Sequence, residues 1–438
     1  MNTFTDKEWG YGDENPALFN PTAFDADAII EALKASGSRA VILTCKHHDG
    51  FCLWPTATTD HSIKNSPYKN GKGDIVREIS DAAHRAGLKF GVYVSPWDRN
   101  SSYYGQPQYL KIYRQQLSEL LTEYGPLFEV WHDGANGGDG FYGGAREKRL
   151  IDKVHYYDWA NTWSMERKLQ PRAVLFSDVG PDVRWVGNEK GIAGETCWAT
   201  YTPRARNGGP ACPGDVREEE SQVGTRDGRF WMPAECDVSI RPGWFWHPSE
   251  NDRVKTPQDL FGLYCDSVGR GASFLLNVPP DRRGLLYERD TASLREFGNL
   301  VRSVFGRNLA EGAKLNASNI RGRSKAYRPE NLVDGNPGTY WATDDSITTP
   351  EVVVELHREI KLSFVRLREY IRLGQRVEEF AIDAWVAGKW QSFGTGTSIG
   401  SCRILQADAP MTTMRIRLRI TKSPVCPALS ELGLFEGG

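Results

Sequence analysis

Phe128-Glu-Val-Trp-His-Asp-Gly-Ala135 is the stretch of the 438-residue chain that decides its predicted fold. A short apolar run ends in Trp131, and the acid Asp133 and the flexible Gly134 follow. A buried parallel strand has this form when it carries an acid to its carboxyl-terminal rim, where the carboxylate can attack a carbon or accept a proton. Taken alone, the segment is explained equally well by a turn aspartate or a helix N-cap.

Strand and helix patterns alternate on both sides of this stretch, from about residue 25 to 305. Strands are predicted at residues 40–45, 89–94, 127–131, 173–176, 196–201, 234–240 and 273–278. Helices are predicted at residues 25–36, 74–86, 156–169, 256–268 and 288–305, with one more ending near residue 124. Repeated β–α units of this length predict an α/β fold, a (β/α)8 TIM-like barrel over residues 1–310. Only seven strands are found, so the first strand is expected at or before residues 1–5, as a truncated start.

The pattern changes after about residue 312, where long helical spacing disappears. Short runs of alternating apolar and polar residues follow at 351–356, 364–370, 380–385 and 414–420, with turn residues between them. Alternation at period two predicts an antiparallel β-sandwich, which we place at residues 311–438.

Charge and composition exclude several classes of protein. The net charge of −2 leaves no basic field to hold nucleic acid. No apolar run is long enough to span a bilayer, and the first residues do not form a signal peptide. The eight cysteines have no CxxC spacing, which argues against a zinc site.

Polar and aromatic side chains follow several predicted strands. His47 and His48 come after residues 40–45, where they could hydrogen-bond a polar ligand, bind a metal, or tuck into the loop. Glu189 lies in a glycine-bearing loop after residues 173–176, and Arg241 and Trp244 follow residues 234–240. Because parallel strands end at one face of a barrel, these groups are expected to gather there.

Asp133 and Glu189 on one rim suggest glycoside hydrolysis, in which one carboxylate is the nucleophile and the other is acid and then base. The 14 tryptophans and 17 tyrosines include many beside polar residues, a combination that suits sugar rings, although core packing explains most tryptophans. Metal-dependent barrel hydrolases also use paired carboxylates, and such an enzyme is a second hypothesis.

Several motifs in order carry a resemblance to the α-L-fucosidases of glycoside hydrolase family 29, over nearly the whole chain. They are Glu8-Trp9-Gly10, Lys46-His-His-Asp-Gly-Phe51, Gly91-Val-Tyr-Val-Ser-Pro-Trp-Asp98, Trp131-His-Asp-Gly-Ala135, Val183-Arg-Trp-Val-Gly-Asn-Glu189, Ile240-Arg-Pro-Gly-Trp244 and Leu275-Leu-Asn-Val-Pro-Pro280.

The resemblance implies a retaining fucosidase that needs no cofactor and acts on fucosylated oligosaccharides or glycoconjugates, in the periplasm or outside the cell. Asp133 matches the nucleophile. Glu189 matches the acid/base of the subgroup that cleaves α-1,3 and α-1,4 fucosyl branches. His47 and His48 match the histidines that hold fucose hydroxyls. The other expected contacts to the sugar are Trp9, Tyr93, Trp131, Arg241 and Trp244.

One departure from the family concerns the start of the chain. The family carries a His-Phe-Gly motif on the first barrel strand, and its histidine contacts fucose; no such motif precedes residues 1–5 here. A truncated start is one explanation. The other is a degenerate protein that binds fucose or glycans with weak activity or none.

Asn331-Leu-Val-Asp-Gly-Asn-Pro-Gly-Thr-Tyr-Trp341 carries a second resemblance, to the discoidin-like (F5/8 type C) β-sandwich. In that family the turn can hold a structural calcium ion, which prefers hard oxygen ligands. The candidate ligands here are Asp334, Asn336, Thr339 and Glu431. The alternative is a plain turn that packs Trp341.

Overall fold

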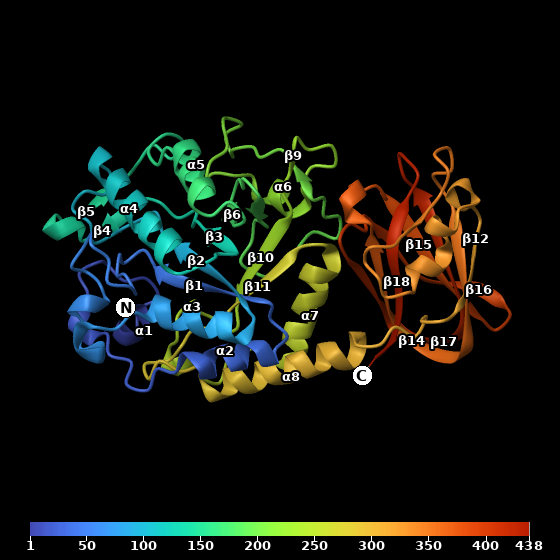
Figure 1. The fold of residues 1–438 in the computed structure, drawn as a ribbon, viewed down its shortest axis with the longest axis horizontal. Helices are drawn as coiled ribbons and strands as arrows, with labels where there is room; N and C mark the ends of the chain where they lie inside the picture. Colours follow the sequence, from blue (N-terminus) through green and yellow to red (C-terminus); the bar gives the residue numbers. More distant parts are fainter. Residues whose placement is uncertain (438) are drawn as a thin grey trace.

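The structure is a computed structural model that describes residues 1–437, and it has two parts that lie side by side (Figure 1). The N-terminal part is built on a parallel sheet in the order β1-β2-β3-β6-β7-β10-β11. Its strands are β1 (Ala40–Lys46), β2 (Lys89–Val94), β3 (Glu129–Trp131), β6 (Val174–Ser177), β7 (Val183–Trp185), β10 (Ala234–Ser239) and β11 (Ser273–Asn277).

Helices cross over between these strands and cover the outer face of the sheet (Figure 1). They are α2 (Ala26–Ala35), α3 (Ile75–Ala86), α4 (Pro107–Glu123), α5 (Trp159–Leu169), α7 (Pro257–Ser267) and α8 (Glu288–Phe305), with the short α1 (Asn2–Thr5) and α6 (Glu218–Val223). Local chemistry sets their ends. Asp74 caps α3 by accepting the Arg77 N–H, and Gly87 ends it in a left-handed conformation.

The predicted α/β organisation is confirmed, but the barrel is open. Within residues 1–437 the parallel sheet has seven strands, and β1 and β11 form its edges, so the sheet is a curled half-barrel rather than a closed (β/α)8 barrel. Residues 2–5, near which a first strand was expected, form the helix α1.

The strand prediction at residues 196–201 is wrong. Only β8 (Thr200–Tyr201) forms there, and it pairs antiparallel with β9 (Phe230–Trp231) outside the parallel sheet. The sheet position belongs to β7, which has three residues and Arg184 at its centre. The Arg184 guanidinium is buried and donates to the carbonyls of Ser221 and Trp198. An arginine inside a short strand interrupts the apolar run by which a buried strand is recognised in the sequence, and its distant backbone partners leave no local pattern.

A second small hairpin joins β4 (Gly138–Gly140) to β5 (Glu147–Arg149).

The C-terminal part is antiparallel throughout, as predicted. Strands run in the order β13-β18-β14-β17-β15-β16, with β12 paired to β14. They are β12 (Lys314–Ala317), β13 (Trp341–Ala342), β14 (Glu351–Glu369), β15 (Glu379–Val386), β16 (Lys389–Thr397), β17 (Arg403–Lys422) and β18 (Ala428–Glu436). The long β14 and β17 have register shifts in their pairing, and their alternate side chains form a core with Trp341.

The two parts share an apolar interface beside α8. Phe305, at the end of α8, packs its ring against Phe364 and Phe435 of the sandwich, with ring centroids 5.5 and 5.2 Å away. Gln375 adds two hydrogen bonds to backbone groups of the N-terminal part, at Ala199 N and Cys197 O. The predicted boundary between residues 310 and 311 falls between the end of α8 and the start of β12.

Arg241 holds the end of β10 against α8, which corrects its predicted role as a substrate contact. Its side chain is 1% exposed. The guanidinium donates two hydrogen bonds to Asp290 of α8, at 2.9 and 3.0 Å, and a third to Asn251 at 3.1 Å. Every contact therefore faces the interior, and the role is structural.

We predict that Asp290→Ala destabilises the protein by about 3–5 kcal/mol, because it leaves a buried guanidinium without its partner. The shift of the chemical or thermal unfolding midpoint measures this. Asp252→Ala is the matched control, since it removes an 85% exposed aspartate from an ion pair with Arg289, and such pairs contribute at most about 1 kcal/mol. Equal midpoints for the two variants would contradict the structural role.

Candidate active site

Asp133 stands at the end of β3, where the parallel register brings neighbouring strands to a common edge. Its side chain is 22% exposed. The Tyr93 hydroxyl, from β2, donates to Oδ2 at 2.6 Å, and the backbone N–H of Ala135 donates to Oδ1 at 2.6 Å. Hydrogen bonds to both oxygens fix the orientation of the carboxyl group. Asp133 is therefore an oriented acid at the mouth of the half-barrel.

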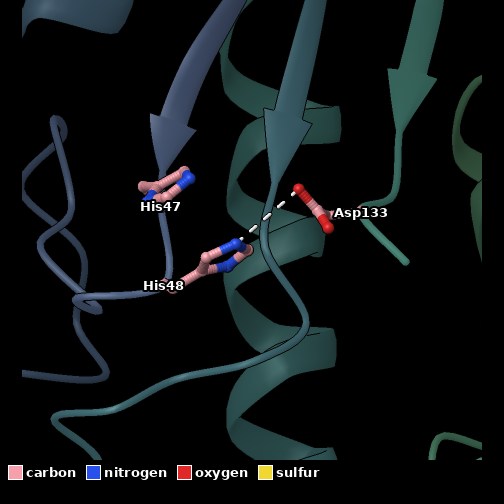
Figure 2. A group of neighbouring side chains, drawn as sticks. All are labelled: His47, His48 and Asp133. Atoms are coloured by element: carbon pink, nitrogen blue, oxygen red, sulfur yellow. Dashed lines mark ion pairs between the residues drawn. The ribbon is translucent and has the colours of Figure 1, made fainter. Parts of the chain in front are cut away.

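A bulge in β1 aims the two histidines at Asp133. The pairing of β1 with β2 shifts register between Thr44 and Lys46. Lys46 is buried on the outer side, where its Nζ donates to Gln116 at 2.8 Å and to Tyr109 at 3.1 Å. Figure 2 shows His47 and His48 at the end of β1, with His48 pointing toward Asp133.

The hydrogen bonds around His48 define its tautomer. Its Nδ1 lies 2.7 Å from the Ser95 hydroxyl, which donates to the carbonyl of Trp97. The hydroxyl must then accept from His48, so Nδ1 carries the hydrogen. Burial lowers the pKa of His48 and outweighs the opposing effect of Asp133. His48 is neutral, and its bare Nε2, 3.9 Å from Asp133, is a hydrogen-bond acceptor facing the site.

His47 has the opposite arrangement. The Asn2 side chain accepts from Gly10 N through Oδ1 at 2.6 Å, so its amide nitrogen faces His47 Nδ1 at 3.5 Å. His47 Nδ1 is then an acceptor, and Nε2 carries the hydrogen. Burial, followed by the closeness of a second imidazole at His48, holds the pKa of His47 well below its usual value. The pair thus offers one donor and one acceptor, which suits hydroxyl groups.

His47, His48 and Asp133 also bring one ligand atom each to within 4.8 Å of one another. This spacing is close enough to share a metal ion, the alternative that the sequence left open. Both Asp133 oxygens already accept hydrogen bonds from Tyr93 and Ala135. The site as it stands thus combines a hydrogen-bonded carboxylate with the free acceptor Nε2 of His48.

Aromatic rings form the wall beside His48. Trp9 is 49% exposed, and its ring meets His48 edge-on with centroids 5.0 Å apart. Trp97 lies 5.2 Å from His48 and 6.0 Å from Trp9. Trp97 and Ser95 were not predicted as site residues. Their position in Ser-Pro-Trp directly after a predicted strand is the signal that could have identified them.

Glu189 follows β7 on the same rim. Asn188 shapes its loop by accepting from Lys190 N at 3.1 Å and donating to the Ile192 carbonyl at 2.9 Å. The Trp244 indole approaches Glu189 Oε2 at 3.4 Å. Burial is the main cause that raises the pKa of Glu189, and the charge of Asp133 adds to it. The two carboxyls therefore differ in setting: both Asp133 oxygens accept hydrogen bonds, whereas burial favours the protonated form of Glu189.

Trp131 lies in the floor of the half-barrel. Its ring stacks between Tyr93 and Phe176, with centroids 5.1 and 4.2 Å away, and it is 9% exposed. Its indole N–H donates to Glu235 at 2.9 Å. A parallel pair links the Trp185 indole to Asp237 at 2.8 Å.

Burial raises the pKa of both Glu235 and Asp237. These two buried acids, which lie on β10, hold the two indoles in place. They were not predicted from the sequence, because acids at alternate positions of a strand normally indicate a solvent-exposed face.

The predicted calcium ligands are engaged otherwise. Asp334 accepts from Asn336 N at 2.8 Å and from the Thr339 hydroxyl at 2.7 Å, so the turn closes on itself. Glu431 forms ion pairs with Arg366 at 2.6 Å and Arg368 at 3.0 Å. Glu431 therefore lies in these ion pairs in the structure, and the calcium site stays a prediction. The turn packs Trp341, which is fully buried.

None of the helices in residues 1–437 combines the length and the apolar character that crossing a membrane requires.

Family comparison agrees with this architecture. Residues 1–304 match the family "Alpha-L-fucosidase", and residues 314–432 match "F5/8 type C domain". Alpha-L-fucosidase 1 of Arabidopsis thaliana is 43% identical over 439 aligned positions, which cover 99% of this chain and 83% of the relative.

Solved structures have the same fold. A putative alpha-L-fucosidase from Bacteroides thetaiotaomicron aligns with a TM-score of 0.89 and 36% identity, over 100% of this chain and 93% of its own. A Ruminococcus gnavus GH29 fucosidase in complex with fucose aligns with a TM-score of 0.87 and 32% identity, over 100% and 91%. The chain therefore belongs to the α-L-fucosidases of glycoside hydrolase family 29, with a C-terminal F5/8 type C domain.

Proposed function

We propose that this α-L-fucosidase releases terminal L-fucose from α-1,3 and α-1,4 branches of fucosylated oligosaccharides or glycoconjugates by a retaining mechanism. Asp133 is the nucleophile and Glu189 is the acid and base. The observation that carries this proposal is the contrast between the two carboxyls. Hydrogen bonds to both oxygens orient Asp133, whereas burial and the charge of Asp133 raise the pKa of Glu189.

The proposed reaction has two steps. An Asp133 oxygen bonds to the anomeric carbon while the bond to the leaving oxygen breaks, and Glu189 gives its proton to that oxygen. The product is a fucosyl ester on Asp133. Glu189, now a carboxylate, takes a proton from water, whose oxygen displaces Asp133 from the sugar. Each displacement inverts the anomeric carbon, so the net outcome is retention.

The neutral histidine pair supports fucose as the bound sugar. His47 offers an N–H and His48 a bare ring nitrogen, so a hydroxyl can accept from one and donate to the other. Trp9 offers an exposed ring to the apolar face of the sugar. The fucose complex of the Ruminococcus gnavus relative supports the same sugar here.

Support for branch specificity comes from the loop that carries the acid. Gly187-Asn-Glu189 resembles the motif of the subgroup that acts on α-1,3 and α-1,4 branches. Asn188 holds that loop through its bonds to Lys190 and Ile192, and Trp244 lies against Glu189. We propose that these groups contact the sugar that leaves.

Asp133→Asn is expected to lower kcat by about 10³-fold or more, because an amide oxygen is a far weaker nucleophile than a carboxylate. Hydrolysis of an aryl fucoside measures this. Asp139→Asn is the matched control, since it changes an exposed aspartate of β4 after the same strand, and activity should persist. Azide should rescue Asp133→Gly and yield the fucosyl azide of inverted configuration.

Retained activity in both Asp133 variants would overturn the assignment. A chelator should leave the wild-type rate unchanged, whereas loss of activity would favour metal-dependent hydrolysis at His47, His48 and Asp133. Tight fucose binding without turnover in the wild type would point to a degenerate binding protein.

Glu189→Gln is expected to lower the rate on a branched oligosaccharide by about 10²–10⁴-fold, because a sugar leaving group needs the proton. The first step with an aryl fucoside of low phenol pKa should change little. Since Glu189 has a raised pKa and acts protonated, kcat/KM should fall as pH rises through that pKa. This alkaline limb should disappear in Glu189→Gln, and its persistence would assign the acid elsewhere.

The branch preference predicts hydrolysis of Lewis-type trisaccharides, in which fucose is α-1,3 or α-1,4 linked beside a galactose. An α-1,2-linked fucosyl disaccharide should be cleaved much more slowly at equal concentration. Release of free fucose with time measures both. Comparable rates on both substrates would remove the branch assignment but leave the fucosidase assignment in place.

A further inference from the structure

Asp178 is a third acid on the rim, and it lies next to Asp133. It has no part in the proposed two-step reaction. The parallel register pairs Trp131 of β3 with Phe176 of β6, and His132 N donates to the Phe176 carbonyl at 3.1 Å. Asp133 and Asp178 each follow that pair by two residues. They therefore occupy equivalent positions at the ends of adjacent strands, and the Asp178 side chain is buried.

Asp178 packs directly on the turn that carries Asp133. A Cβ built on Gly134 would lie 2.8 Å from Asp178 Oδ1 and closer still to Oδ2, so only glycine fits beside this carboxyl. Asn136, in the same turn, donates to the Gly134 carbonyl at 2.8 Å. The turn of residues 134–136 is thus enclosed by Asp178 on one side.

A short segment, residues 212–215, lies across the same turn, and we call it the rim strap. Cys212 and Asp215 bond to each other through their backbones, which makes the strap a tight loop. The N–H of Gly214 donates to Asp178 Oδ2 at 2.6 Å, and Asn136 donates to the Pro213 carbonyl at 3.2 Å. Lys153 donates to the Gly214 carbonyl at 3.1 Å.

Gly214 packs closely between the rim strap and the turn of residues 134–136. Its φ of +84° belongs to the left-handed region, and a Cβ there would collide with the Gly134 carbonyl oxygen.

We propose that Asp178 is a positioning residue for Asp133. Its carboxyl clamps the rim strap onto the turn of residues 134–136, and the clamp holds Asp133 in the orientation that attack on the anomeric carbon needs.

The electrostatic setting of Asp178 is consistent with this role. Burial raises the pKa of Asp178 to about 7; the Gly214 N–H lowers it, the charge of Asp133 raises it, and Arg206 and Lys153 lower it. Below neutrality Asp178 is largely protonated, so it lies beside the Asp133 anion without strong repulsion. A second permanent charge at this distance would destabilise the nucleophile's charged form.

The inference rests on the proposed role of Asp133, and one set of variants tests both. Asp178→Ala removes the clamp and should lower kcat on an aryl fucoside by about 10²-fold, because a small misplacement of a reacting group has an effect of that size. Asp178→Asn keeps an oxygen that can accept from Gly214 N and should restore most of kcat. The Kd for fucose should stay unchanged in both variants, since the histidine pair is untouched.

Asp182→Asn is the matched control. Asp182 lies on the same loop between β6 and β7, and it accepts from the Leu175 backbone N–H at 2.8 Å, as Asp178 does from Gly214. It faces Arg167 rather than the rim. Its kcat should equal that of the wild type. If Asp178→Ala does not fold, Asn136→Ala loosens the strap from its other end and should lower kcat without weakening fucose binding.

Covalent trapping separates this inference from the proposed function. With 2-deoxy-2-fluorofucosyl fluoride, an Asp133 oxygen bonds to the anomeric carbon as fluoride leaves with the bonding electrons, and mass spectrometry locates the label. Labelling of Asp178→Ala should slow by the same factor as kcat. Wild-type labelling rates in Asp178→Ala would overturn the clamp while the nucleophile stands. A wild-type enzyme labelled elsewhere than Asp133 would overturn the proposed function.

The pH dependence of stability gives a readout independent of activity. The folded pKa of about 7 exceeds the ordinary aspartate value of about 3.9. The folded protein therefore binds more protons than the unfolded chain between these values, and Asp178 lowers stability as pH rises through that window. The fall in unfolding midpoint from pH 4 to pH 7 should be smaller in Asp178→Asn than in the wild type. Equal falls would contradict this account of Asp178.

Discussion

The hydrogen bond from Tyr93 to Asp133 depends on the parallel register of β2 and β3, and the rest of the site depends on that register. Tyr93 and Trp131 are paired across the two strands. Asp133, two residues beyond Trp131, therefore lies within hydrogen-bonding distance of the Tyr93 hydroxyl. The same edge receives His47 from β1 and Glu189 from the loop after β7. Parallel strands end at one edge, so side chains far apart in sequence converge there without contacts of their own.

The outer side of the same strands is held by a polar face of α4. Tyr109 and Gln116 accept from Lys46, the residue before His47. Tyr113 bonds His132, the residue before Asp133, whose other ring nitrogen lies 3.1 Å from Glu166 of α5. Side chains alternate across a strand, so each site residue has a neighbour that points away from the site. Buried hydrogen bonds fix those neighbours, and this limits the freedom of the rim residues.

Burial favours the protonated form of several acids inside the half-barrel, whereas both oxygens of Asp133 accept hydrogen bonds. Glu235 and Asp237 hold indoles, and burial raises the pKa of both carboxyls. Glu189 and Asp178 lie nearer the rim and follow the same rule. A hydrogen-bonded carboxylate among neighbours that favour the protonated form suits a reaction in which positive charge develops on a sugar ring and a proton must be available to the leaving group.

The sequence by itself determined the alternation of strands and helices, the antiparallel character of the last 130 or so residues, and the rim positions of Asp133, His47, His48 and Glu189. Each depends on a local pattern: apolar runs, helix ends, or a polar residue directly after a strand. Three-residue β7 was missed because Arg184 breaks its apolar run, and its charge is satisfied only by the distant carbonyls of Ser221 and Trp198.

Only the tertiary structure decided which polar residues face the site. Arg241 follows a strand in a motif that resembles the family's. Its guanidinium is nevertheless buried, and it donates hydrogen bonds to Asp290 of α8. Asp178 carries no motif and still comes to lie beside Asp133. The tautomers of the histidine pair depend on Asn2 and Ser95, which come from two other segments. Such roles are set by partners distant in the chain, and local sequence patterns carry no information about partners that only folding brings within hydrogen-bonding distance.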